Sequence, residues 1–177
     1  MTFDGGDYMV LRAADDMDGV LAGMGGPHPE TYIFYLDPLI MSGAQATIFS
    51  KYSDPRWVLI RWEGASSRIL FLNRQIGGTD ELYYLAAGST AELQNKGSIF
   101  AYVRDTNTQT IYVNAVPVAA DTDATVDASS VSSAYIGASH LGQNLPAGNG
   151  LRFFGYSRTA WTQTQLRALQ RFLRGVL

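Results

Sequence analysis

The acidic side chains are the residues of this sequence that could cleave a glycosidic bond, and their spacing argues against it. Glycoside hydrolysis needs two carboxyl groups a few ångströms apart, one as an acid and one as a base or nucleophile. The four glutamates, Glu30, Glu63, Glu81 and Glu92, lie far apart along the chain. Asp80 adjoins Glu81, but neighbouring side chains of a strand point to opposite faces. We therefore predict that the protein is not an enzyme, although a glycan-cleaving enzyme remains the third hypothesis.

Catalysis by a cysteine or serine nucleophile, and metal binding by thiolates, have even less support in the sequence. The sequence has no cysteine, which excludes thiolate metal sites, disulfides and cysteine nucleophiles. A serine nucleophile needs a neighbouring base. The two histidines, His28 and His140, lie in predicted loops, and no Gly-x-Ser-x-Gly motif occurs.

Two acidic clusters carry oxygen ligands of the kind that calcium prefers. One covers residues 15–19, and the other consists of Asp121, Asp123 and Asp127. The second cluster begins like an EF-hand loop but lacks glycine at its sixth position and has Ser132 where glutamate is needed. A solvated acidic loop is the favoured interpretation, and a calcium site is the alternative. No other cofactor is expected.

Aromatic side chains are abundant, with ten Tyr, eight Phe and three Trp, and they suggest a binding surface. The predicted strand Trp57–Trp62 is apolar on both faces, whereas antiparallel sheets usually leave one face to water. Loops and a terminal helix, a second subunit, or a ligand could cover the second face. The candidate ligand- or interface-binding residues are Trp57, Arg61, Trp62 and Tyr35.

Composition limits the partners of the protein. Charged residues make up 16% of the 177 residues, and the formal net charge is −3, without a basic patch that would favour nucleic acid. No apolar run is long enough to predict insertion into a membrane. The first eleven residues lack the basic start and apolar core of a signal peptide. The length is that of one domain, which we expect over residues 1–177.

Short strand patterns recur about every ten residues, with turn residues between them, which favours an all-β sandwich or barrel. The pattern ends in a helix with Thr162 as N-cap, Gln165 as its capping-box partner and an apolar stripe of Leu166, Leu169 and Leu173. We expect this helix to pack against the edge of the sandwich. The predicted strands are Tyr8–Arg12, Thr31–Leu36, Ala46–Tyr52, Trp57–Trp62, Ile69–Leu72, Glu81–Leu85, Ser98–Arg104, Thr110–Val113, Val116–Ala119, Ala134–Ile136 and Leu151–Ser157.

The order of several motifs resembles the laminin-G-like branch of the concanavalin A-like lectin/glucanase superfamily. These motifs are Phe3–Val10, Tyr32–Pro38, Ile48–Lys51, Ile111–Ala115, Ala134–Gly137 and Leu151–Leu166. The resemblance implies a jelly-roll sandwich of two antiparallel sheets with one short C-terminal helix. Phe153-Phe154-Gly155 replaces the acids of the family's last strand, so no ligand role of those acids carries over.

A non-enzymatic binding or assembly module is the leading hypothesis for function. The fold analogy and the missing signal peptide favour a phage virion protein, as a capsid decoration or as a tail or baseplate adsorption component. Its expected partners are virion or self subunits in a homo-oligomer, with glycans as further ligands, and its expected location is the virion. The alternative is a secreted carbohydrate-binding lectin domain, which would be extracellular.

Overall fold

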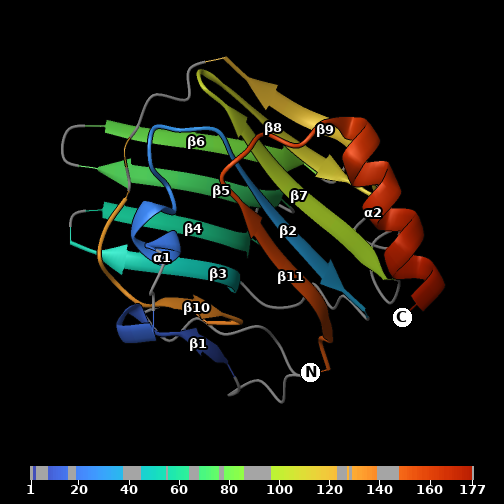
Figure 1. Ribbon diagram of the computed structural model, residues 1–177, viewed down its shortest axis with the longest axis horizontal. Coiled ribbons are helices and arrows are strands. Elements are labelled where there is room, and N and C mark those ends of the chain that lie inside the picture. Colours follow the sequence, from blue (N-terminus) through green and yellow to red (C-terminus); the bar gives the residue numbers. More distant parts are fainter. Residues whose placement is uncertain are drawn as a thin grey trace.

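The computed structural model of the chain is a sandwich of two antiparallel sheets, with a helix lying on one outer face (Figure 1). It describes residues 2, 8–15, 19–37, 45–54, 56–63, 68–75, 78–85, 97–122, 127, 129–138 and 148–176. The predicted all-β sandwich of two antiparallel sheets is confirmed.

The first sheet has six strands within the described ranges, in the order β1-β10-β3-β4-β5-β6, and we call it the six-stranded sheet. Strands β3 to β6 follow one another as antiparallel hairpins. β10 joins β3 to the edge strand β1. The bounds are β1 Met9–Leu11, β3 Gln45–Ser53, β4 Arg56–Glu63, β5 Arg68–Gln75, β6 Gly78–Leu85 and β10 Ala134–Ile136.

The second sheet has the order β11-β2-β7-β8-β9 over the part of the chain that the structure describes, and we call it the five-stranded sheet. β7, β8 and β9 form the meander that the turn residues predict. Its second turn holds Asn114 and Ala115 at φ 51° and 59°, the left-handed geometry of a two-residue hairpin. The bounds are β2 Glu30–Leu36, β7 Ser98–Asp105, β8 Thr108–Val113, β9 Val116–Asp121 and β11 Leu151–Ser157.

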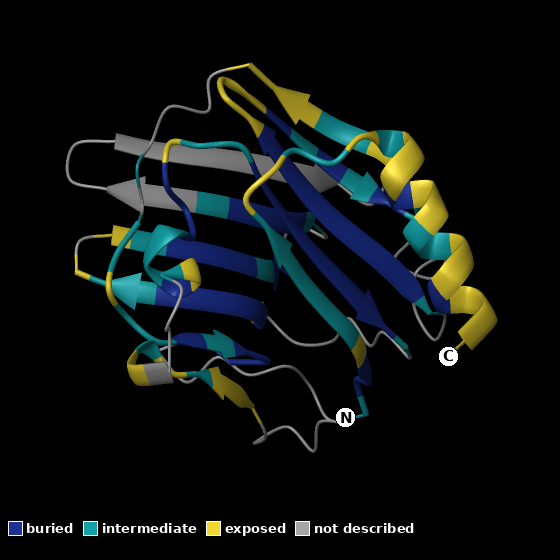
Figure 2. Cartoon of the chain, in the orientation of Figure 1, coloured by how far each residue is buried: buried dark blue, intermediate teal, exposed yellow. Residues whose placement is uncertain are grey.

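The main core lies between the two sheets, where Figure 2 shows the buried strands. Tyr32, Phe34, Phe49 and Phe100 are each at most 1% exposed, and burial of each such ring is worth roughly 1.5–3 kcal/mol. A short helix α1 (Val20–Gly23), preceded by a 3-10 turn at Ala13–Asp15, closes one end of this core. Neither element was predicted, because four residues are too few to show a helical period.

Helix α2 (Gln163–Val176) begins as predicted, because Thr162 and Gln165 form the capping box. Its expected position at the sandwich edge is wrong: α2 packs over the outer face of the five-stranded sheet. The reason is that the outer face of the five-stranded sheet is apolar, and α2 buries it. Leu166 and Leu173 contact a cluster that consists of Ile33, Tyr35, Ile99, Ala101, Val103 and Ala115. No helix among the described residues is long and apolar enough to cross a membrane.

Candidate functional site

A cleft opens on the outer face of the five-stranded sheet, beside the first residues of α2. Its volume is about 240 Å³, and its walls come from β7, β8 and the segment before α2. We call it the Trp161 cleft. Its lining residues are Val103, Asp105, Thr108, Thr110, Tyr112, Ala160, Trp161 and Thr162.

The alternation of β8 places three side chains in the cleft. Gln109, Ile111 and Val113 are buried on the inner side of the strand. Thr108, Thr110 and Tyr112 therefore point outward. In the register with β7, Asp105 lies opposite Thr108 and Val103 lies opposite Thr110. A carboxylate and two hydroxyls thus lie side by side on the floor of the cleft.

A buried threonine anchors the wall that carries Trp161. The Thr31 hydroxyl donates to the Thr159 carbonyl at 2.8 Å and accepts from the Trp161 backbone N–H at 3.0 Å. Thr31 is fully buried on β2, so the segment is tied to the sheet before α2 begins. The indole of Trp161 is half-buried and packs against the cluster beneath α2.

The chemistry of the cleft suits a polyhydroxylated ligand. The flat apolar faces of Trp161 and Tyr112 can contact the C–H faces of a sugar ring. The Asp105 carboxylate accepts hydrogen bonds, and threonine hydroxyls both donate and accept them. The volume is below the ~300 Å³ typical of drug-sized pockets, so the cleft has room for one sugar unit.

Sequence reasoning did not find this cleft. Trp161 is not among the predicted ligand residues. The available signal was the outward row of Thr108, Thr110 and Tyr112. This row forms a cleft only together with residues 160–162, which come about fifty positions later in the chain. The sheet brings the two segments together.

The predicted ligand residues do not form one site. Trp57 and Arg61 are four residues apart on β4, so both side chains lie on the outer face of the strand. Trp62 faces the other way and is only 4% exposed in the main core, so its ring is not available to a surface ligand. Tyr35 lies on the other sheet, buried beneath α2. The helix thus covers the outer face of β2.

The outer face of the six-stranded sheet carries an aromatic row. The Tyr52 and Trp57 rings meet edge to face at 5.7 Å, and the Tyr8 and Tyr135 rings lie 6.0 Å apart. Tyr135 pairs with Ser50 on β3, two residues before Tyr52. Rings from the residue before β1 and from β10, β3 and β4 therefore follow one another across this face.

An ion triad lies farther along the same face. Glu63 accepts from Arg61 through one oxygen and from Arg68 at 2.7 Å through the other. Burial alone would raise the pKa of Glu63, but the hydrogen bonds and charges of the two arginines outweigh it and lower the pKa. The Arg61 guanidinium is thereby held by Glu63, which limits its reach toward a ligand.

The predicted calcium ligands are engaged locally. Asp121 accepts from the Thr122 backbone N–H at 2.6 Å. Asp127 accepts from the Ser129 backbone N–H at 2.9 Å and from its hydroxyl at 2.6 Å. Asp123 lies outside the described residues. No group of three possible metal ligands occurs among the described side chains, and calcium binding stays a prediction.

A buried polar network lies at the end of the sandwich near α1. The Glu30 carboxylate is fully buried and accepts from the Gly25 N–H at 3.0 Å, the Tyr32 hydroxyl at 3.1 Å and the Tyr156 hydroxyl at 3.3 Å. Burial raises the pKa of Glu30 to about 7, although these hydrogen bonds and the charge of Arg104 oppose the rise. Burial also raises the pKa values of both tyrosines.

A scan against protein-family models finds no match, and a search of curated proteins finds none at a significant level. Solved structures with a similar fold include binding domains of botulinum neurotoxins. The receptor-binding domain of the C/D mosaic serotype matches with a TM-score of 0.74 and 11% identity, over 97% of this chain and 41% of that chain.

Two further matches are described with their ligands. The binding domain of neurotoxin DC in complex with rat synaptotagmin II has a TM-score of 0.73 and 11% identity, over 94% of this chain and 40% of that chain. The same domain in complex with SialylT has a TM-score of 0.71 and 11% identity, over 94% and 39%. The chain spans about two fifths of these structures. At this identity the likeness shows the fold alone, a β-sandwich.

Proposed function

We propose that this protein is a non-enzymatic binding module that holds a sugar unit of a glycan in the Trp161 cleft. The observation that carries the proposal is the composition of the cleft, which is lined by a half-buried tryptophan, a carboxylate and threonine hydroxyls. The similar fold of toxin domains, one of them in complex with SialylT, supports a binding role.

The acid content of the cleft supports binding without cleavage. Glycoside hydrolysis requires two carboxyl groups flanking the scissile bond. Of the eight residues that line the cleft, Asp105 is the one acid. A single carboxylate can orient a sugar hydroxyl, but it cannot supply both the acid and the base.

A glycan array tests this proposal. The protein should bind a defined set of glycans, and Trp161→Ala and Asp105→Ala should each weaken that binding about tenfold or more. Asp121→Ala is the matched control for an exposed aspartate outside the cleft and should bind normally. Trp57→Ala tests the aromatic row with Arg61 as the alternative surface. A flat array, or binding lost only with Trp57→Ala, would contradict the assignment to the cleft.

Assembly into a phage virion is a second proposal. Exposed apolar side chains support it: Phe172 and Val176, one turn apart on α2, are 61% and 65% exposed. Val116 on the edge strand β9 is 54% exposed, and the adjacent Ala115 packs against α2. Such side chains suit a contact with a second copy or another virion subunit. Membership of the laminin-G-like branch is part of this proposal, and the order of the motifs supports it.

Light scattering of the purified protein tests the assembly. We expect a homo-oligomer that Phe172→Glu converts to a monomer, while Val131→Glu, at a residue 82% exposed elsewhere, has no effect. A strictly monomeric protein would rule the assembly out. Neighbouring genes for capsid or tail parts would distinguish a virion protein from a secreted lectin domain.

A further inference from the structure

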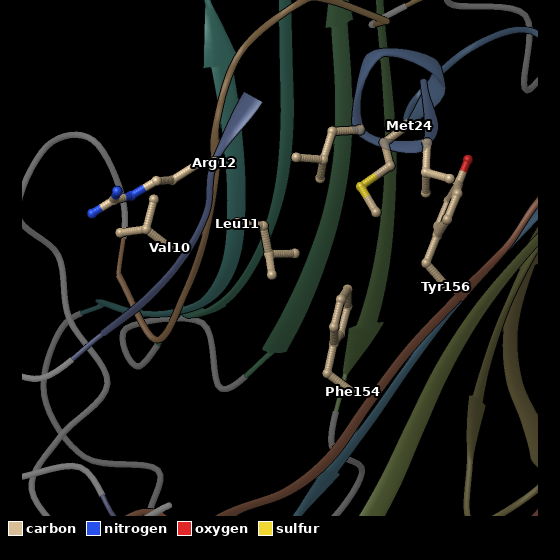
Figure 3. Close-up of a pocket in the computed structure, with 8 residues that line it drawn as sticks. Val10, Leu11, Arg12, Met24, Phe154 and Tyr156 are labelled. Atoms are coloured by element: carbon tan, nitrogen blue, oxygen red, sulfur yellow. The ribbon is translucent and has the colours of Figure 1, made fainter. Parts of the chain in front are cut away.

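A second cavity lies at the open edge of the sandwich, between β1 of one sheet and β11 of the other (Figure 3). Its volume is about 360 Å³, within the range of ~300–1,000 Å³ that is usual for small-molecule sites. We call it the edge cavity. Six of its eight lining residues are apolar; the full lining is Val10, Leu11, Arg12, Val20, Leu21, Met24, Phe154 and Tyr156.

The floor of the edge cavity is rigid. The Phe154 ring stacks on Phe49, with ring centres 5.8 Å apart and planes 18° apart, and it also contacts Phe34. Met24 is 2% exposed and belongs to the main core. Figure 3 shows Leu11, Met24, Phe154 and Tyr156 directed toward a common space. The cavity is therefore formed by core side chains that packing already holds in place.

Polar contacts hold the α1 segment, which forms the roof. Lys51 Nζ donates to the Met24 carbonyl at 3.3 Å, and Arg104 Nη1 donates to the Gly26 carbonyl at 3.0 Å. Glu30 accepts from the Gly25 N–H at 3.0 Å, and Arg158 donates to the Gly19 carbonyl. These four side chains come from separate strands or from the end of a strand.

The hydrogen bonds that hold the α1 segment explain why the cavity does not close. Apolar side chains normally collapse to fill a gap, because a void loses dispersion contacts. Three of these four side chains, those of Glu30, Lys51 and Arg104, are buried, and their hydrogen bonds to the α1 segment would break if the segment moved inward. The apolar lining of the cavity thereby stays accessible to water. An apolar ligand would bury this lining, and the burial would favour its binding.

Exposed apolar side chains occur at the entrance. Val10 on β1 and Val20 on α1 line the edge cavity and are each 37% exposed. Tyr8 and Met9, which directly precede Val10 in the chain, are 50% and 38% exposed.

The cavity offers no charged partner to an anionic head group. Arg12 is the one residue with a charged side chain among the eight that line the cavity. It is exposed, and its guanidinium points away from the cavity in Figure 3. A charged head group would therefore lose its hydration without gaining a partner among the lining side chains.

We propose that the edge cavity binds a neutral apolar small molecule of one or two rings, or a short alkyl chain. This site is separate from the Trp161 cleft, which lies on the outer face of the other sheet at the start of α2. The proposal does not depend on glycan binding.

Titration with N-phenyl-1-naphthylamine, a neutral fluorescent probe, tests the proposal. We expect saturable 1:1 binding with a dissociation constant in the micromolar range. Val20→Trp and Val10→Trp place an indole at the entrance and should each weaken binding tenfold or more. Val131→Trp makes the same change at an exposed valine that does not line the cavity and should bind like the natural sequence. Thermal unfolding verifies that each variant is folded.

Displacement of the probe tests the charge selectivity. 1-Decanol should displace the probe at least tenfold more effectively than decanoate, which has the same chain length and a charged head. The proposal is overturned if the probe does not saturate, or if both entrance variants bind within twofold of the natural sequence. Equal displacement by decanol and decanoate would overturn the assignment to neutral ligands.

Discussion

Glu30→Gln should remove much of the dependence of stability on pH between about 4.5 and 7. The carboxyl group of Glu30 has a pKa of about 7 in the folded protein, against 4.5 for an exposed glutamate. The folded state therefore holds this proton more tightly than the unfolded chain does. The resulting stabilisation is fully present below pH 4.5 and is lost as the pH rises to about 7.

The magnitude follows from the two pKa values. The difference between 4.5 and about 7, at ~1.4 kcal/mol per pH unit, corresponds to about 3 kcal/mol of unfolding free energy. Glu30 is fully buried, so solvent does not screen this effect. Glutamine has nearly the same shape as the protonated acid and keeps an oxygen for the Gly25 N–H and the two tyrosine hydroxyls.

Urea unfolding at pH 4.5, 6, 7 and 8 measures the effect. The natural protein and Glu30→Gln should have similar free energies of unfolding at pH 4.5, and the variant should be more stable by about 3 kcal/mol at pH 8. The comparison cancels the titration of all other groups. Parallel curves for the two proteins across this range would refute the reasoning, because they would show an ordinary pKa for Glu30.

Three further changes probe the packing and the charges. Glu63→Gln should lower the free energy of unfolding, measured with urea, by about 1 kcal/mol at pH 7 and by progressively less below pH 4.5. The reason is that the lowered pKa of Glu63 gives stability that is lost as the pH falls. An equal cost at pH 7 and pH 3 would contradict this. Thr162→Ala removes the N-cap of α2 and should lower the urea midpoint by the equivalent of about 1 kcal/mol with an unchanged m-value; an unchanged midpoint would show that the cap adds nothing. Leu173→Ala should cost about 2–4 kcal/mol in the same assay, whereas Phe172→Ala, at the adjacent exposed residue, should cost less than about 0.5 kcal/mol. Equal costs would contradict the burial of the Leu173 face of α2 against the sheet.

The elements of this fold are readable from the sequence, because each has a local signal. All eleven predicted strands occur, with bounds within three residues, since alternation and turn residues act over short distances. The capping box likewise identifies the start of α2 at Thr162 and Gln165. The α1 segment is absent from the prediction because tertiary contacts, such as that of Lys51 with the Met24 carbonyl, fix it.

The site depends on information that the local patterns do not contain. Alternation shows that Trp57 and Trp62 face opposite ways, but it does not say which side the second sheet covers. Only the sandwich itself puts Trp62 in the core and leaves Trp57 on an outer face. The burial of Glu30 was also unforeseen, because its partner Tyr156 lies 126 residues later in the chain.

The three tryptophans allow a direct test of the central claim, because each reports on a different place. Trp161 lies in the cleft, Trp57 on the outer face of the six-stranded sheet and Trp62 in the core. Their indole N–H signals can be followed by ¹⁵N NMR while a glycan selected by the array is added. The account predicts that the Trp161 signal shifts, that the Trp62 signal stays in place and that the glycan is recovered intact. A shift of Trp57 without Trp161, or cleavage of the glycan, would contradict it.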